Sequence, residues 1–267
     1  MTIHSPRFSD NRKEYKLPIA LKRGATKEFT WWLDEGQLID GSIIKQHLWE
    51  PYSTWAVERL VEPAMVVLDA GANMGYYTVL MSYLVGTTGS VISVEAMPDP
   101  CAITREHCRL NDCTNVMLLQ KALGKSSAPA SKTFFNFSWP PSRCQQSPDE
   151  IETVAIDDLD LQRLDFAKVD LDGSELDFIV GAKQTLKRLK TTLLLEVCDY
   201  TLRQTAQQDM PGESNYVYGS KTLEMLSILQ DLGYHFLWEE SFTPALKEQT
   251  ITSFDLSKRS INLVCLC

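Results

Sequence analysis

The sequence predicts an α/β fold, built on a doubly wound, mostly parallel, seven-stranded sheet with an N-terminal extension of strand and helix. Two observations carry this prediction. Short apolar runs alternate with longer segments of helical character along most of the chain. Several of these runs end in a carboxylate and a turn, which is where parallel strands place their ligands. We expect residues 1–60 to form the extension and residues 61–267 the main domain.

The stretch 66–77 is the clearest of these units, with a buried strand, a glycine turn and a covered helix from Tyr76. A dinucleotide site needs G-x-G-x-x-G, so that a pyrophosphate meets bare backbone. Here Asn73 stands in place of the second glycine, between Gly71 and Gly75. The spacing therefore favours S-adenosylmethionine over NAD, although an ordinary strand-to-helix connection would use the same glycines.

A second apolar run, Ser90–Val94, ends in Glu95. In an α/β nucleotide site, an acid at this place accepts hydrogen bonds from the ribose hydroxyls. The glycine turn and Glu95 together predict a nucleotide-type cofactor more strongly than either does alone.

Composition limits the function classes. The chain has 267 residues, with 26 basic and 35 acidic side chains and a formal charge of −9. No run of Lys or Arg resembles a phosphate-binding tract, so we expect no nucleic-acid partner. The acidic balance is typical of a solvated surface.

The seven cysteines are odd in number and include no C-x-x-C, which indicates reduced thiols and a cytoplasmic protein. The four histidines form no ligand-spaced cluster, so a structural zinc site is not expected. The N-terminus has no signal-peptide pattern, and no apolar run is long enough to span a bilayer, so we expect no membrane partner.

Residues 1–25 lack periodicity and predict a poorly ordered arm. From Phe29 to Leu60, aromatic and aliphatic residues predict a strand-and-helix element packed on the main sheet, an apolar element that is compatible with a homodimer. Within it, Glu50 and Tyr52 are candidates for a pocket role. His47 fits a solvated or capping role better.

Beyond Glu95, Pro98 opens a predicted helix that runs to Asn111, and residues 115–119 form a third buried strand. Ala122 then falls where an adenine edge would lie. Residues 126–150 are an excursion rich in Ser, Pro and Gln that carries an aromatic island at 134–141. The island suits either a cover for an acceptor pocket or a hairpin packed on the edge of the sheet.

The remaining elements continue the alternation. The ranges are a strand at 151–156, a strand ending at Asp170, a helix from Ser174 to Leu186, a strand at 191–197, a loop at 203–219, a helix at 221–232, and strands at 235–238 and 261–267. The last two predict a terminal hairpin with an antiparallel last strand.

Asp170, Asp172 and Glu196 follow two of these strands, at the edge that also holds Asp69 and Glu95. They are our candidates for catalysis, as a base or as groups that orient an acceptor. Alternatively they hold a hard divalent cation such as Mg²⁺. For Asp157, Asp158 and Asp199 a capping or surface role is the better interpretation. Glu175, in the first turn of its helix, suits the helix dipole.

Several spaced blocks resemble the FkbM-type S-adenosylmethionine-dependent methyltransferases, over roughly residues 48–240. The blocks are Asp69-Ala-Gly71-Ala-Asn73-Met-Gly75-Tyr76-Tyr77, Val94-Glu95-Ala96-Met-Pro98, Asn111 with Asn115, Lys168-Val-Asp170-Leu-Asp172-Gly173-Ser-Glu175, and Leu195-Glu196. The resemblance implies a Rossmann-like class I methyltransferase fold.

The resemblance also implies roles for individual residues. Asp69, Gly71, Asn73 and Gly75 would contact the methionine end of S-adenosyl-L-methionine, Glu95 would bind its ribose, and Asp170 would lie near the methyl group. The family usually has Glu at Asp172 and Pro at Ala96. The full predicted cofactor set is Asp69, Gly71, Ala72, Asn73, Gly75, Tyr76, Glu95, Ala96, Ala122 and Asp170.

The function that the resemblance favours is O-methylation of a hydroxyl on a small molecule, a sugar or a natural-product intermediate. N-methylation of a peptide or protein side chain is the alternative. An NAD-type oxidoreductase and a non-catalytic nucleotide-binding protein are alternatives from other classes, because a fold does not establish an activity.

Overall fold

A computed structural model describes residues 11–21, 26–131, 151–197, 214–238 and 261–267. The chain divides into two compact units, Met1–Gln120 and Lys121–Cys267. The predicted extension, residues 1–60, belongs to the first unit, and its separation from the rest at residue 60 stays a prediction. The aromatic island at 134–141 lies outside the described residues.

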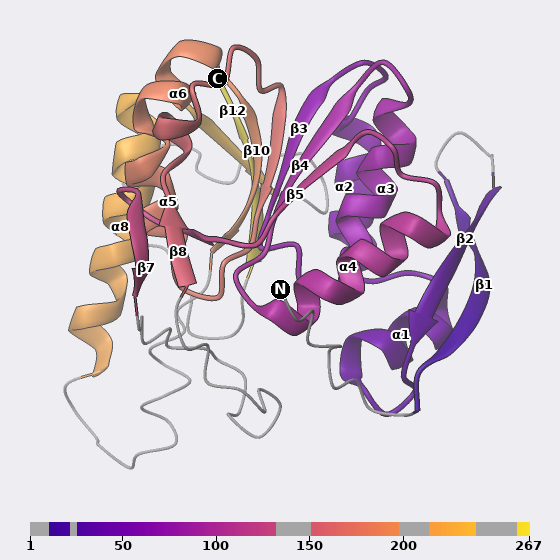
Figure 1. The fold of residues 1–267 in the computed structure, drawn as a ribbon. Helices are drawn as coiled ribbons and strands as arrows, with labels where there is room; N and C mark the ends of the chain where they lie inside the picture. Colours follow the sequence, from indigo (N-terminus) through magenta and orange to yellow (C-terminus); the bar gives the residue numbers. More distant parts are fainter. Residues whose placement is uncertain (1–10, 22–25, 132–150, 198–213, 239–260) are drawn as a thin grey trace. The chain divides into compact units, whose positions relative to one another are not determined.

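The first unit contains the predicted strand, turn and helix succession (Figure 1). Its strands β3, β4 and β5 are parallel and pair in that order. Val and Ile predominate in β3 and β4, which are almost fully buried, because β-branched residues suit a sheet that is covered on both faces. The elements are β1 (Lys13–Ala20), β2 (Thr26–Leu33), α1 (Leu38–Gln46), α2 (Pro51–Leu60), β3 (Val66–Ala70), α3 (Tyr76–Val85), β4 (Ser90–Val94), α4 (Pro98–Leu110) and β5 (Val116–Leu119).

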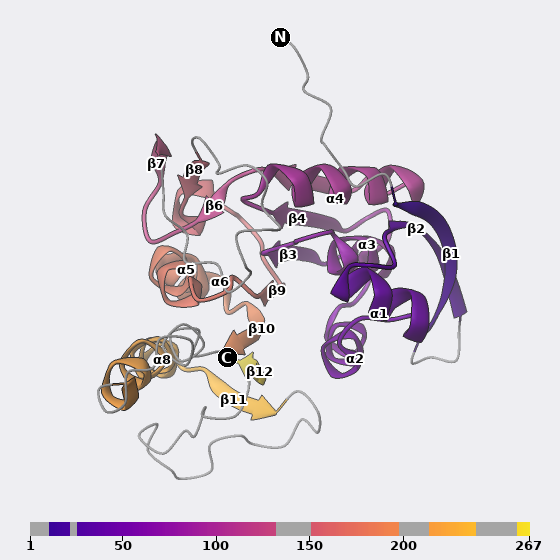
Figure 2. The same ribbon diagram turned by 90° about the horizontal axis from the view of Figure 1, so that it is seen from below.

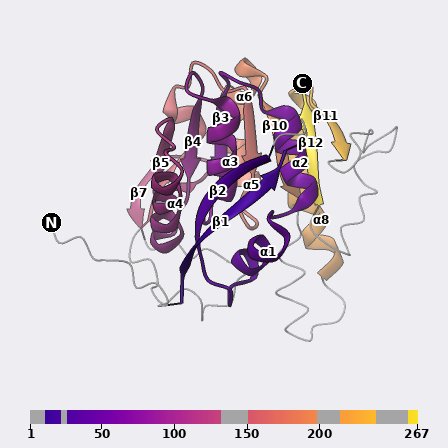
Figure 3. The same cartoon turned by 90° about the vertical axis from the view of Figure 1, so that its right-hand side faces the viewer.

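Strand β1 corrects the prediction of a poorly ordered arm for residues 13–20, which pair with β2 in an N-terminal ribbon. Residues 1–10 and 22–25 of the predicted arm lie outside the described residues. The two strands pair antiparallel along their full length. One face of the ribbon is buried and carries Leu17, Ile19, Phe29, Trp31 and Leu33. The alternation of apolar and polar residues in β1 is difficult to recognise in the sequence, because the outer face of the strand is charged and Pro18 interrupts it. Strand β2 lies beside α4 (Figures 2 and 3), whereas the predicted element from Phe29 to Leu60 was expected to pack on the main sheet.

The second unit contains the other half of the α/β pattern. Strands β9 and β10 are parallel, β12 runs antiparallel to β10, and β11 pairs antiparallel with β12. The elements are β6 (Ala122–Leu123), β7 (Ala128–Ser131), β8 (Ile151–Val154), the 3-10 helix η2 (Ile156–Leu159), β9 (Phe166–Val169), α5 (Glu175–Gly181), α6 (Lys183–Leu189), β10 (Thr192–Val197), α8 (Ser214–Asp231), β11 (His235–Trp238) and β12 (Ile261–Leu266).

The sheet confirms the predicted fold class. It is a mixed, mostly parallel sheet of seven strands, of which the first unit supplies three and the second unit four. The terminal hairpin and its antiparallel strand are also confirmed. Strands β6, β8 and β7 form a separate three-stranded sheet in the second unit.

Two helix predictions need correction. The predicted helix from Ser174 to Leu186 is two helices, α5 and α6, which meet at Ala182. The predicted loop at 203–219 is helical from Ser214 onward, because α8 begins there. Polar residues in the first part of α8 concealed that helix. Residues 203–213 lie outside the described part of the chain.

Candidate functional site

The glycine turn joins β3 to α3 in the first unit, and its backbone is left-handed at three positions. The φ angles are +86° at Gly71, +50° at Asn73 and +83° at Gly75. The N–H groups of Gly71 and Ala72 both donate to the Val94 carbonyl, each at 3.0 Å. The turn is therefore tied to the end of β4, and the Asn73 side chain is exposed.

Gly75 is required by its surroundings as well as by its φ angle. A Cβ atom at this position would lie 2.7 Å from Cγ2 and 2.9 Å from Oγ1 of Thr104, a buried residue of α4. The Thr104 hydroxyl donates to the Asn73 carbonyl at 2.7 Å. Helix α4 therefore packs directly against the turn and holds its shape.

Glu95 lies at the end of β4 and fixes the same turn. Its Oε2 accepts from the N–H of Asn73 and its Oε1 from the N–H of Met97, both at 2.8 Å. Two backbone donors hold the carboxylate in one orientation, as recognition of a ribose would require. The structure thus brings Glu95, Ala96 and the glycine turn together in the first unit.

Asp69 is placed differently from what its predicted role suggests. Its side chain is 1% exposed, and its Oδ2 accepts from the Thr78 hydroxyl at 2.5 Å. The Thr78 hydroxyl also contacts the Ser93 hydroxyl at 2.8 Å. Asp69 therefore joins β3 to α3 inside the fold, and its contact with a cofactor stays a prediction.

Tyr76 is also a buried residue. Its ring stacks on Trp31 with 5.5 Å between ring centroids, and its hydroxyl lies 3.2 Å from the Thr54 hydroxyl. Burial raises the pKa of Tyr76 to about 12. A contact between Tyr76 and a cofactor would therefore involve its backbone, and this prediction is also untested.

The segment before β3 carries the predicted pocket residues. The Tyr77 hydroxyl donates to Oε2 of Glu50 at 2.9 Å, so Glu50 is engaged by α3. Tyr52 is 54% exposed. His47 is exposed and ends α1 in a left-handed conformation, which agrees with its expected capping role.

In the second unit, an ion pair marks the C-terminal end of β9. The Nζ atom of Lys168 lies 2.7 Å from Oδ2 of Asp170, and the two side chains are 3% and 27% exposed. Burial raises the pKa of Asp170, but the Lys168 ammonium and hydrogen bonds from Glu196 and Lys168 lower it by more. Asp170 is therefore a carboxylate at neutral pH.

Glu196 comes from the neighbouring strand β10. Because β9 and β10 are parallel and Val169 lies opposite Leu195, the next residues, Asp170 and Glu196, emerge side by side. The hydrogen bond between Glu196 and Asp170 lowers the pKa of Asp170. The structure thus brings two of the three predicted catalytic acids together.

The third acid, Asp172, lies in the turn between β9 and α5. Its φ angle is +52°, and the buried Glu175 holds this turn by accepting from the N–H groups of Leu171 at 2.9 Å and Gly173 at 3.1 Å. Burial raises the pKa of Glu175 to about 7, against the opposing effect of these donors. The dipole role predicted for Glu175 is therefore incomplete, because its side chain shapes the loop after Asp170.

The structure offers no support for a metal at these acids. In the described part of the chain, no three His, Cys, Asp or Glu side chains lie close enough to hold an ion. At Asp170 the neighbouring cation is the Lys168 ammonium. Asp157 has the predicted capping role, since its carboxylate accepts from the N–H groups of Thr185 at 2.7 Å and Gln184 at 3.0 Å in α6. Asp199 lies outside the described residues.

Ala122 opens β6 in the second unit and is 4% exposed, paired opposite Thr153. The adenine contact predicted for it is untested. Within the residues that the structure describes, no helix combines the length and the apolar character that a membrane span requires.

Two residues that shape these sites were not assigned roles from the sequence. Lys168 could have been found, because residues two apart in a strand face the same side, which places its ammonium beside Asp170. His107 could not, since nothing in a helix sequence shows that its ring contacts a strand 75 residues away.

The fold is that of a mixed, mostly parallel α/β protein, and its glycine turn is tied to Glu95 at the end of the adjacent strand. A family model described as the methyltransferase FkbM domain matches residues 69–236, which is more than half of the chain. The chain belongs to this family and is an S-adenosylmethionine-dependent methyltransferase. This assignment decides against the NAD-type oxidoreductase.

Solved structures give a weaker likeness. An FkbM methyltransferase from Methylobacillus flagellatus KT is 17% identical with a TM-score of 0.43, and the match covers 85% of this chain and 57% of that one. A SAM-dependent methyltransferase from Aquifex aeolicus is 17% identical, with a TM-score of 0.43 and coverages of 86% and 94%. Fibrillarin from Aeropyrum pernix, in complex with S-adenosyl-L-methionine, is 14% identical, with a TM-score of 0.44 and coverages of 94% and 93%. No curated protein matches the sequence.

The residues of the first unit fit S-adenosyl-L-methionine. A left-handed turn carries the exposed Asn73 side chain, a polar group that suits an amino-acid moiety. The Glu95 carboxylate is held by two backbone donors at the end of the adjacent strand, and a carboxylate is the group that accepts from ribose hydroxyls.

Proposed function

We propose that this protein methylates a hydroxyl group on a small molecule, a sugar or a natural-product intermediate. The observation that carries the proposal is the Lys168–Asp170 ion pair, with the ammonium buried and the carboxylate partly exposed. An ionised carboxylate can only accept hydrogen bonds. Asp170 therefore suits an acceptor that brings its own proton, as a hydroxyl does.

The cofactor supplies an electrophilic methyl group on a positively charged sulfur. Asp170 accepts a hydrogen bond from the acceptor hydroxyl and so directs an oxygen lone pair at the methyl carbon. Asp170 would also take the hydroxyl proton that the acceptor loses when it is methylated. Orientation of this kind is worth about 7–11 kcal/mol, and a placed base adds about 10²–10⁴-fold.

Lys168 and Glu196 set the state of Asp170. The ammonium keeps the carboxylate ionised, at the cost of basicity, and this makes orientation the larger part of its role. Glu175 and the left-handed Asp172 hold the loop that begins at Asp170.

For the cofactor we propose the contacts that the family resemblance implies. Asn73 and the backbone of Gly71, Ala72, Gly75 and Tyr76 would hold the methionine end. Glu95 and the neighbouring Ala96 would hold the ribose. The arrangement of Glu95 and the glycine turn supports these roles. The cofactor-binding roles of Asp69, Ala122 and Asp170 rest on the family resemblance alone.

We also propose a cytoplasmic location. All five cysteines in the described ranges are free thiols, as is usual in a reducing compartment.

The first experiment is calorimetric titration of the purified protein with S-adenosylhomocysteine, on the native chain and on Glu95→Ala. We expect binding by the native chain that is lost in the variant. Binding that is unchanged in Glu95→Ala would refute the ribose assignment.

The second experiment follows transfer of a labelled methyl group to panels of hydroxylated small molecules and of peptides. We expect label on the hydroxylated panel, and a large loss of kcat in Asp170→Asn. Asp157→Asn, which changes a capping acid, is the matched control and should keep native turnover. Label on peptide nitrogen alone would favour the N-methylation alternative, and full turnover by folded Asp170→Asn would remove Asp170 from the mechanism.

A further inference from the structure

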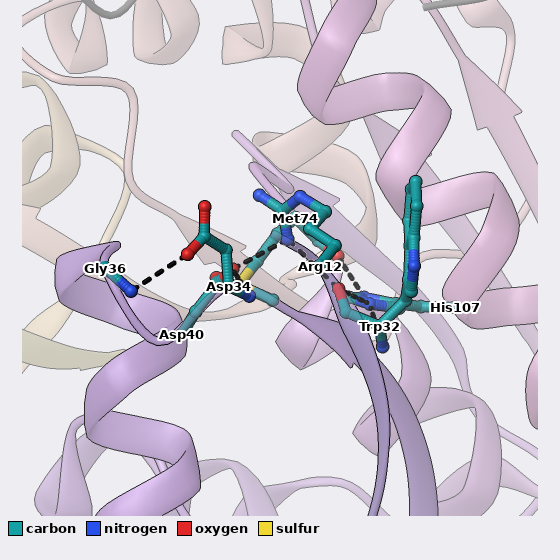
Figure 4. A network of polar contacts seen from close by, with 7 residues as sticks. All are labelled: Arg12, Trp32, Asp34, Gly36, Asp40, Met74 and His107. Carbon is teal, nitrogen blue, oxygen red and sulfur yellow. Dashed lines mark hydrogen bonds and ion pairs between the residues drawn. The ribbon is translucent and has the colours of Figure 1, made fainter. Parts of the chain in front are cut away.

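His107 of α4 is completely buried, and both of its ring nitrogens are engaged (Figure 4). Its Nε2 accepts from the N–H of Trp32 in β2 at 3.0 Å. Its Nδ1 lies 2.8 Å from the carbonyl of Met74, in the glycine turn. A single side chain therefore connects the N-terminal ribbon to the turn.

The contacts determine the tautomer of His107. The Met74 carbonyl, 2.8 Å from Nδ1, can only accept a hydrogen bond, so the ring proton is on Nδ1. Nε2 then carries a lone pair that accepts from the Trp32 N–H at 3.0 Å, and it also lies 3.2 Å from the Trp32 carbonyl. Nδ1–H then donates to the Met74 carbonyl. The opposite tautomer could donate from Nε2 to the Trp32 carbonyl, but it would lose the bond from the Trp32 N–H and place a lone pair against the Met74 carbonyl. Burial lowers the pKa of His107 to about 4, so the ring is neutral at physiological pH.

Other contacts of α4 reinforce this link. The Asn111 side chain accepts from the N–H of Thr30 at 2.8 Å and donates to its carbonyl at 2.7 Å, which anchors the middle of β2. In the middle of the helix, the Thr104 hydroxyl donates to the Asn73 carbonyl. His107 and Asn111 therefore hydrogen-bond to the ribbon, and His107 and Thr104 hydrogen-bond to the glycine turn.

The backbone of Trp32 is itself held firmly. Nη1 of Arg12 in the segment before β1 donates to the Trp32 carbonyl at 3.0 Å and forms an ion pair with Asp40 of α1 at 2.6 Å (Figure 4). The same Asp40 carboxylate accepts from Asp34 N–H at 2.9 Å. The ribbon is therefore a rigid support for the His107 ring.

We infer that His107 is a positioning residue, through which the N-terminal ribbon sets the conformation of residues 73–75 for cofactor binding. The inference rests on the proposal that this turn binds the cofactor. The Nδ1–H bond orients the Met74 carbonyl and with it the peptide plane that joins Met74 to Gly75, next to the left-handed Gly75. The ribbon becomes part of the cofactor site without any contact to the cofactor.

Two isosteric variants separate this role from a purely structural one. In His107→Asn, the amide N–H₂ occupies the place of Nδ1 and can still donate to Met74, while the acceptor for Trp32 is lost. In His107→Gln, the amide oxygen reaches toward the place of Nε2 and can accept from Trp32, while the donor to Met74 is lost. We expect affinity for S-adenosylhomocysteine to fall about tenfold more in His107→Gln than in His107→Asn, at equal loss of thermal stability.

A spectroscopic readout accompanies the titration. In ¹⁵N-histidine-labelled native protein, His107 should show a protonated Nδ1, assigned by its absence from His107→Asn, and this resonance should shift on binding S-adenosylhomocysteine. If either variant fails to fold, Asn111→Ala replaces it, because it loosens β2 without changing His107 or the turn. We expect weaker binding by this variant as well.

The outcomes are distinguishable. If the native protein fails to bind S-adenosylhomocysteine, the proposed cofactor site is wrong. If the native protein binds and the folded variants share its affinity, or the Nδ1 resonance is unmoved by the ligand, the positioning role of His107 is overturned while the cofactor site stands.

Discussion

The Lys168 ammonium and the Asp170 carboxylate, two residues apart in the chain, form an ion pair in which the cation is almost fully buried. A buried cation beside a partly exposed acid keeps the acid ionised and fixes its direction. Both effects are useful in a group that must orient an acceptor.

Replacing Lys168 by Met should raise the pKa of Asp170, because the attraction that holds the carboxylate ionised is removed. If ionised Asp170 is needed for transfer, the acid side of the pH profile of kcat should move to higher pH. The profile is measured with a fixed acceptor at saturating cofactor. An unshifted acid side would show that Lys168 does not control the reacting group. Lys187→Met, a change in the last turn of α6, is the control.

Glu95→Gln should weaken S-adenosylhomocysteine binding by about tenfold or more. An amide has one oxygen where the carboxylate has two, so its N–H₂ would face the N–H of Asn73 or of Met97. The calorimetric control is Glu106→Gln, which changes an acid on α4 that pairs with Arg109. Equal affinities in the two variants would contradict the role of Glu95.

Gly75→Ala should destabilise the protein more than Gly233→Ala. Both glycines have left-handed φ angles, for which alanine costs about 1–2 kcal/mol. At Gly233 a Cβ would lie 3.7 Å from the Cys267 sulfur, an ordinary contact, whereas at Gly75 it would overlap Thr104. Overpacking adds about 1–3 kcal/mol. Chemical denaturation gives the comparison, and equal midpoints would mean that the turn moves freely away from α4.

Stability should fall in acid because of His107. Burial lowers its pKa from 6.5 to about 4, while Arg12 acts in the same direction and Glu106 opposes it. Between these pH values the unfolded chain binds the proton and the folded chain does not, so the free energy of unfolding drops as the pH falls, by about 3 kcal/mol over the window. Denaturant titrations at several pH values on native protein and His107→Asn test this. The variant should show a flatter dependence, and parallel curves would argue against a neutral buried ring.

Asp157→Ala should cost about 1 kcal/mol of stability and leave methyl transfer intact, because Asp157 caps α6 from the preceding 3-10 helix. Thermal unfolding and the transfer assay are run together. Asp158→Ala, which removes a longer contact of 3.3 Å to the N–H of Ser127, should cost less. A loss of turnover at native stability would indicate that Asp157 takes part in the site.

Features that depend on residues close together in the chain could be predicted from the local sequence pattern. The run 66–77 predicted a strand, a turn and a helix because the apolar period changes there, and the glycines mark backbone that other residues adopt at a cost. Asp170 and Glu196 were predicted at one edge because parallel strands end together. The broken helix at Ala182 and the early start of α8 were missed, since helix ends depend on weak local preferences that tertiary packing overrides.

The partners of these residues became visible only in the folded protein. Asp69 and Tyr76 stand in the signature that predicts the cofactor, yet their side chains are used inside the fold, by Thr78 and by Trp31. The link from the N-terminal ribbon through His107 to the glycine turn joins residues far apart in the chain, and no periodicity records such a contact. The fold class, the family and the acids that end the strands could be predicted from the residues alone, because they follow from the order and spacing of residue types. The direction and protonation of each group depend on burial and on distant donors, and these exist only once the chain is folded.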